Sequence, residues 1–134
     1  MATLEEIAQL FYGDGAAIPG WGGSQEDLIA LAARVFPGKA FCVVKQWILI
    51  GLTVTPEEKE KMTKLALLPA TLFAHEVVLD SKNRFQPGMW VRSNFGLSFS
   101  QGCMFETNST VYLLSGPGQR KEATVGAAFS MSAG

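Results

Sequence analysis

The sequence has little charge, and this shortage excludes two classes of protein. Charged residues make up 17% of the 134 residues, hydrophobic residues make up 48%, and the net charge is −1. A chain this apolar is not disordered, because it has enough hydrophobic surface to form a core. The last third, residues 81–134, carries five basic and two acidic residues. That excess is too small for a surface that binds duplex nucleic acid, because such affinity grows with the number of phosphates neutralised.

The sequence also lacks a long hydrophobic run. The longest apolar stretch, Ile48 to Val54, is interrupted by Gly51 and Thr53, and it is much shorter than the roughly 20 residues that a membrane helix needs. The chain begins with Thr3, Glu5 and Glu6 and shows no basic region followed by an apolar one, so it has no secretory signal. We therefore expect a cytoplasmic protein that does not contact a membrane.

Cysteine and histidine are scarce as well. Cys42 and Cys103 lie far apart among apolar residues, and no second cysteine or histidine lies at metal-ligand spacing. We expect both to be buried free thiols. His75 is the only histidine and is followed by Glu76, but neighbouring side chains on a strand point to opposite faces, so a catalytic pair is not expected. We predict no cofactor, no metal and no enzymatic activity, with an enzyme acting through His75 or Cys103 as a third alternative.

The length of the chain fits one domain over residues 1–134, with a helical part at about 1–69 and a strand-rich part at about 70–131. In the helical part, three segments have the sequence signals of helices. In each helical segment a Ser or Thr cap precedes an apolar helical spacing or a Pro at the first helical position. The predicted helices run from Thr3 to about Tyr12, from Ser24 to before Pro37, and from Thr55 to before Pro69.

The rest of the chain has the alternation and the turn residues of β-strands. Phe41 to Leu52 fits a central strand buried on both faces, or a bent hairpin. Gly116 to Gly118 predicts a sharp reversal. Further strands are predicted at Leu72–Leu79, Met89–Ser93, Phe95–Ser100, Cys103–Thr107, Thr110–Ser115 and Ala123–Met131. The fold class that follows is α+β, with about three helices packed on a twisted antiparallel sheet or a partly closed small barrel.

Four residues are candidates for contacts with a partner. Trp90 and Arg92 alternate with Val91, so they share one face of a strand, and both residue types are enriched at protein interfaces. If that face lies inside, Trp90 belongs to the core instead. Arg120 and Lys121 follow the Gly116 turn, where they form either a contact patch or a solvated hairpin tip.

Two C-terminal segments resemble an uncharacterised family of small proteins encoded by bacterial prophages and phages. The segments are Phe85–Ser93 and Cys103–Gly118. That family has no assigned activity, so the resemblance carries no functional residue to this chain. It implies a context, since small phage proteins often bind and modulate a host protein, including components of antiviral defence.

The function that we predict is a non-enzymatic protein-binding module, such as a phage-encoded modulator of a host complex. Its contacts would come from Trp90, Arg92, Arg120 and Lys121. The alternative is a barrel that binds a small molecule or single-stranded nucleic acid through aromatic residues. An exposed sheet edge would favour a homodimer.

Overall fold

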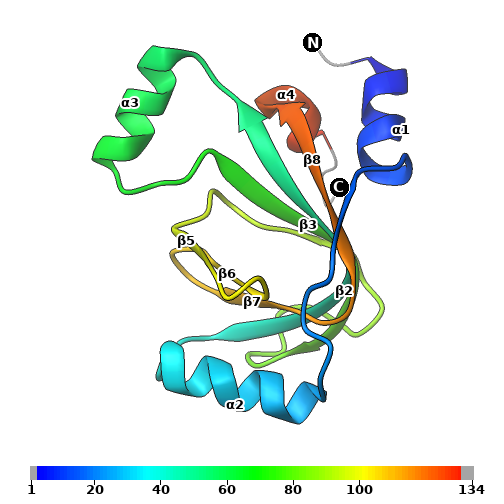
Figure 1. Ribbon diagram of the computed structural model, residues 1–134, viewed down its shortest axis with the longest axis vertical. Helices are drawn as coiled ribbons and strands as arrows, with labels where there is room; N and C mark the ends of the chain where they lie inside the picture. Colours follow the sequence, from blue (N-terminus) through cyan, green and yellow to red (C-terminus); the bar gives the residue numbers. More distant parts are fainter. Residues whose placement is uncertain (1–2, 131–134) are drawn as a thin grey trace.

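The computed structural model describes residues 3–130 and has an α+β fold built on a curled mixed sheet (Figure 1). The sheet curls into a half-barrel. The helices are α1 (Leu4–Tyr12), α2 (Gln25–Val35), α3 (Pro56–Lys64) and the short α4 (Val125–Ala128). The strands are β1 (Ala16–Ile18), β2 (Phe41–Thr53), β3 (Ala70–Asp80), β4 (Val91–Arg92), β5 (Ser98–Ser100), β6 (Met104–Glu106), β7 (Val111–Leu114) and β8 (Gly118–Thr124). The strand order is β1-β8-β2-β7-β6-β5, and β3 pairs with β2 and β4.

The long central strand β2 changes faces at its middle. Val44 belongs to the cluster inside the half-barrel, and so does Trp47, three residues later. In a regular strand these two side chains would point to opposite faces. Gln46 lies between them with a φ of 51°, the left-handed conformation that costs a non-glycine residue about 1 kcal/mol. The irregularity at Gln46 therefore shifts the alternation by one residue, and β2 presents a different face to each half of the molecule.

The first half of β2 pairs in parallel with β7, and the second half pairs in parallel with β8. The chain thus runs beside β2 twice in the same direction, with a break at residues 115–117. The indole nitrogen of Trp47 donates to the Gly116 carbonyl at 3.0 Å across this break. Gly118 lies against the Trp47 ring so closely that a Cβ on this residue would overlap it. Trp47 therefore fills the space where β7 and β8 separate.

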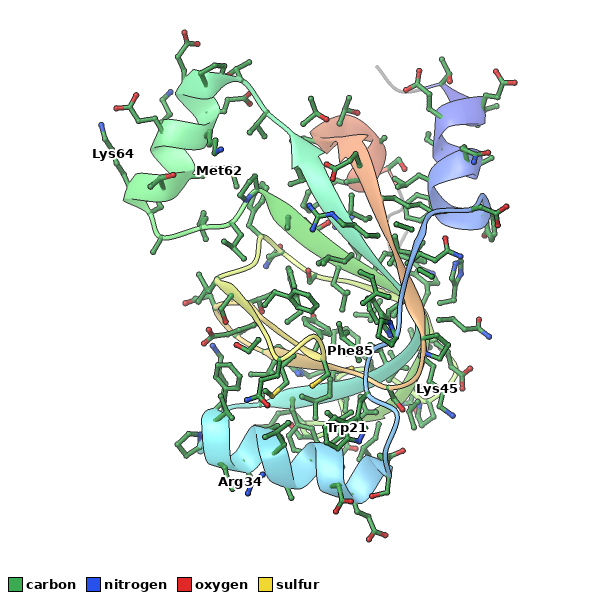
Figure 2. The ribbon with its side chains drawn as sticks, viewed as in Figure 1. Trp21, Arg34, Lys45, Met62, Lys64 and Phe85 are labelled. Atoms are coloured by element: carbon green, nitrogen blue, oxygen red, sulfur yellow. The ribbon has the colours of Figure 1, made fainter. Side chains whose placement is uncertain are left out.

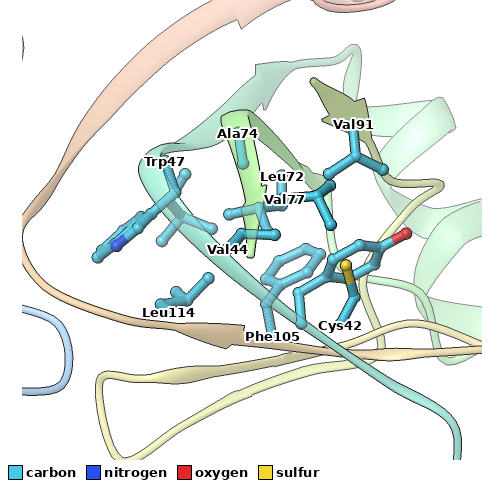
Figure 3. Packing of buried hydrophobic residues seen from close by; sticks show 11 residues of the cluster. Cys42, Val44, Trp47, Leu72, Ala74, Val77, Val91, Phe105 and Leu114 are labelled. Atoms are coloured by element: carbon cyan, nitrogen blue, oxygen red, sulfur yellow. The ribbon is translucent and has the colours of Figure 1, made fainter. Parts of the chain in front are cut away.

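The interior of the half-barrel is filled by buried side chains (Figure 3). They come from β2, β3, β4, β6 and β7, and Phe85 packs against them from the loop after β3. Hydrogen bonds of Gly96 with Leu68 and Ala70, and of Leu97 with Glu106, join the start of β3 to β6. The buried members are Cys42, Val44, Trp47, Leu49, Leu72, Ala74, Val77, Val91, Phe105, Tyr112 and Leu114.

Helices cover the outer face of β2 at both ends. α2 packs Leu28 and Ala32 against a cluster with Val43 from the first half of β2. α1 and α4 cover the second half, where Phe11 lies 4.6 Å from Phe73, ring centre to ring centre. α3 has no buried residue and stands away from the body, with Lys64 pointing outward (Figure 2). None of the helices in the described range is long and apolar enough to cross a membrane.

The sequence predicted the fold class and the three main helices, and the structure confirms them. Thr3, Ser24 and Thr55 each accept a hydrogen bond from the backbone three residues later, which is the predicted cap. Glu58 completes a capping box at α3 by accepting from the Thr55 backbone at 2.9 Å. Phe41 to Leu52 is the central strand, and the free cysteines are both buried.

Two predictions about the C-terminal part are wrong. The chain does not reverse at Gly116 to Gly118, because β7 and β8 are both parallel to β2, so the sheet is mixed and not wholly antiparallel. The strand predicted from Ala123 ends at Thr124, whose hydroxyl accepts from the Ala127 backbone and caps α4; Met131 lies outside the described residues. Ala127 and Ala128 are buried in the cluster that contains Leu10 and Phe11, and this helical packing outweighs the alternating pattern.

A buried carboxylate anchors the loop after β3. Asp80 is 3% exposed, and it accepts hydrogen bonds from the backbone and the guanidinium of Arg84 at 2.7 to 3.0 Å. Arg84 also donates to Thr110 at 2.8 Å, which ties this loop to the start of β7. Burial alone raises the pKa of the Asp80 carboxyl, but the Arg84 hydrogen bonds outweigh it and the pKa is lowered.

The Asp80–Arg84 pair makes stability depend on pH. Because the pKa of Asp80 is lower in the folded than in the unfolded chain, its contribution is present above about pH 4 and is lost on acidification through the folded pKa. We expect Asp80→Asn to lower the free energy of unfolding at pH 7 by about 1–3 kcal/mol. Urea unfolding at several pH values should show this difference shrinking below about pH 4, whereas Glu60→Gln, at an exposed pair, should have little effect. A difference that stays constant down to pH 3 contradicts the assignment.

Gly118 tests the packing at the bend. A methyl group at this position overlaps the indole of Trp47, which is 1% exposed and is held by its hydrogen bond to the Gly116 carbonyl. We expect Gly118→Ala to lower the free energy of unfolding by about 1–3 kcal/mol, as overpacking does elsewhere. Gly22→Ala is the control, because nothing lies within 4 Å of a Cβ there. Equal stability of the two variants in denaturant unfolding would show that the bend tolerates a larger residue.

Candidate functional site

Trp90 and Arg92 lie beside the aromatic cluster under α1 and α4. Trp90 is half-buried, and its ring stacks on Phe73 at 5.8 Å between centres. The Arg92 guanidinium lies 4.6 Å from the centre of the Phe129 ring and donates to the Phe129 carbonyl at 3.3 Å. Both side chains therefore take part in packing α4 onto the sheet. As contacts with a partner they stay predictions.

Arg120 and Lys121 do not lie at an exposed turn, and that expectation is wrong. Both belong to β8, where neighbouring side chains point to opposite faces. Arg120 is exposed and lies 3.4 Å from the carboxylate of Glu122. Lys121 is only 9% exposed. The structure therefore gives these two cations different surroundings.

Lys121 caps the C-terminal end of α1. Its ammonium group donates to the carbonyls of Gln9 at 3.1 Å, Leu10 at 2.6 Å and Gly13. The Gln9 carbonyl also accepts from the Gly13 backbone at 2.9 Å, so the ammonium group adds to the backbone cap at the helix end, where the helix dipole favours a cation. Burial lowers the pKa of the Lys121 ammonium, while Asp14 opposes the shift. Lys121 thus holds an N-terminal helix to the last strand of the sheet.

The chemistry of the thiols and of the histidine favours structural roles. Burial raises the pKa of the Cys42 thiol to about 12, and the negative charge of Asp80 contributes to this shift. Burial also raises the pKa of the Cys103 thiol. Neither is a ready nucleophile at neutral pH. The Nε2 atom of His75 donates to the Phe11 carbonyl at 2.9 Å, and in the tautomer that carries its proton on Nε2 the Nδ1 atom is an acceptor. Within residues 3–130, no group of three or more His, Cys, Asp or Glu side chains could hold a metal ion.

A hollow lies where β2 bends, and we call it the bend pocket. Its volume is ≈ 630 Å³, within the range of small-molecule sites. The end of α1, the bend in β2, β3 and the start of β8 form its walls. None of the described residues that line it is Asp, Glu, Lys or Arg. The side chains and backbone that define it are those of Tyr12, Gln46, Trp47, His75, Gly118 and Gln119.

A second hollow, the β5 notch, lies on the concave side of the sheet. Its volume is ≈ 210 Å³ and its surface is mostly apolar. It opens between the connection from α3 to β3 and the β5–β6 hairpin. β5 pairs with β6 and ends the strand order, so no strand of the described chain pairs with its other edge. The notch is lined by Leu49, Leu68, Ala70, Phe99, Phe105 and Arg120.

Neither hollow could be predicted from local sequence patterns. The bend pocket combines residues 12, 46, 75 and 119, which come together only through the topology of the sheet. One signal was available, because Lys45–Gln46 is the polar interruption of an apolar strand. Of the four candidate residues, Arg120 is the one that lines the β5 notch.

Comparison with known proteins identifies a family model that covers most of the chain. A family model described as a domain of unknown function (DUF6957) matches residues 19–130. No curated protein and no solved structure matches the chain. The matched span contains the sheet from β2 to β8 and leaves α1 and β1 outside.

The role of Lys121 as a cap predicts a local effect. In Lys121→Met the carbonyls at the end of α1 lose the ammonium donor, so we expect α1 to open more readily, by about 1 kcal/mol or roughly fivefold in amide exchange. Hydrogen exchange of residues 4–13 measures this. Arg120→Met is the matched control, because the Arg120 side chain forms a hydrogen bond only with Glu122 among the described residues. Equal exchange in both variants would remove Lys121 from this role.

Proposed function

The chain belongs to the DUF6957 family, whose function is unknown, and from its own surface we propose that it is a non-enzymatic protein-binding module. The observation that supports this proposal most is the β5 notch, an apolar hollow beside an unpaired sheet edge. Exposed strand edges are sites where a partner's extended segment adds as a further strand.

The notch and the edge suit an extended segment of another protein. Main-chain groups of the segment would pair with β5, and one apolar side chain would enter the notch. Phe99 lines the notch and is 36% exposed, so an apolar side chain of β5 is accessible to such a segment. Affinity would come from backbone hydrogen bonds and specificity from the side chain in the notch.

The charge beside the notch favours an acidic neighbour in the partner segment. Arg120 lines the notch, and its side chain is 55% exposed with one long contact to Glu122. A carboxylate of the partner could form a bidentate ion pair with the Arg120 guanidinium, at a shorter distance than the contact with Glu122. We therefore propose a partner segment with an apolar residue followed or preceded by Asp or Glu.

The resemblance of residues 85–93 and 103–118 to prophage proteins extends the proposal. On that basis the partner is a host protein, and the module modulates a host complex such as an antiviral defence system. The chain itself would then perform no reaction, and its effect would be to occupy or reshape a surface of its partner.

The experiment is capture of binding proteins from a bacterial lysate, with and without nuclease treatment, with three variants compared with the wild type. We expect one stoichiometric protein that is lost with Phe99→Ser and weakened with Arg120→Ser. Leu4→Ser is the matched control, because Leu4 is 86% exposed and distant from the notch in sequence and fold. Thermal unfolding of each variant separates lost binding from lost folding.

A second measurement examines the mode of binding. In the purified complex, the amides of Ser98 to Ser100 should exchange more slowly than in the free protein, because a new strand protects them. A captured protein that binds the Phe99 and Arg120 variants as well as the wild type contradicts the notch as the interface. A bound species that disappears with nuclease contradicts protein binding itself.

A further inference from the structure

Beyond protein binding, we propose that the bend pocket binds an uncharged nucleobase, carried by a free nucleoside or by a single strand. The pocket lies at the bend of β2, away from the β5 notch, and shares no described lining residue with it. Its volume of ≈ 630 Å³ is sufficient for a ligand larger than one ring system.

Aromatic side chains give the pocket a stacking surface. Tyr12 is 75% exposed although it is a large apolar residue, and its ring lies 5.5 Å from that of His75 at 40°. Trp47 contributes to the wall from the other side of the bend. A flat ring placed against Tyr12 and His75 would cover the exposed aromatic surface, and every nucleobase has such a face.

Neutral hydrogen-bonding groups lie around the same hollow. His75 has Nδ1 as an acceptor, because its Nε2 is engaged by the Phe11 carbonyl. Gln46 and Gln119 line the pocket with side-chain amides, a group that pairs with the edge of a base through a donor and an acceptor together. The side-chain oxygen of Gln119 is buried and has no hydrogen-bond partner among the described residues. After rotation of the amide toward the pocket, this oxygen would accept a hydrogen bond from a donor of the ligand.

Two further features separate this pocket from an accidental hollow. Gln46 holds a left-handed backbone conformation at φ 51° and yet carries a polar side chain at the pocket, where glycine would fit the backbone better. The lining has no Lys or Arg among the described residues, so a phosphate gains no partner there. The ligand that fits is therefore the base itself, and its sugar or phosphate points outward.

The experiment is a calorimetric titration of the full chain with adenosine, guanosine, cytidine and uridine, and with their 5′-monophosphates. We expect saturable binding of at least one nucleoside. The affinity for its 5′-monophosphate should differ from the affinity for the nucleoside by no more than about twofold. Single-stranded oligonucleotides of the same base form the second arm. Tighter binding of the oligonucleotide identifies a strand as the source, and equal or weaker binding identifies a free nucleoside.

Variants test the site. Tyr12→Ala should weaken binding at least about fivefold, the lower range of base stacking on an aromatic side chain. Gln46→Gly removes the amide at a position where the backbone suits glycine, so it should weaken binding without unfolding the protein. Leu4→Ala, on the same helix as Tyr12, should bind like the wild type. The proposal is overturned if no nucleoside or oligonucleotide binds, or if both pocket variants bind as the wild type does; neither result bears on the β5 notch.

Discussion

The bend of β2 at Gln46 determines how the rest of the molecule is arranged. Because the alternation of side chains shifts there, Val44 and Trp47 both face the interior, and the outer faces of the two halves of β2 need different covers. α2 covers one and α1 with α4 covers the other. Trp47 packs beside β2 at the break where β7 ends and β8 begins. One irregular residue in a central strand thus gives a single sheet two cores outside and one inside.

The bend also lies at one of the two candidate sites. The separation of β7 and β8 leaves space beside the bend for the pocket around His75 and Tyr12. The other candidate site, the β5 notch, lies beside the strand that ends the strand order. The bend pocket therefore depends on how β2 is built, and the β5 notch on where the sheet ends.

Local signals in the sequence were sufficient for the helices and for most strand positions. The caps at Thr3, Ser24 and Thr55 act within three residues, so the chain alone specifies where α1, α2 and α3 begin. The parallel pairing of β7 and β8 with β2 joins residues about 70 positions apart, and no local pattern contains it. The burial of Lys121 could not be predicted for the same reason, because the carbonyls that hold it belong to a helix more than a hundred residues earlier. The alternation from Ala123 onward was compatible with either a strand or a helix of small residues, and packing against α1 favoured the helix.

The attachment of α1 to Lys121 also sets an order of events during synthesis. Lys121 follows Gln9 by 112 residues, so the group that completes the C-terminal end of α1 leaves the ribosome long after the helix itself. Domains begin to fold while the chain is still growing, and a short isolated helix is unstable in water. Until β8 has joined the sheet, α1 has neither its cap nor the strand beside which it lies. The first helix to be made is therefore among the last parts of this protein to reach its final place.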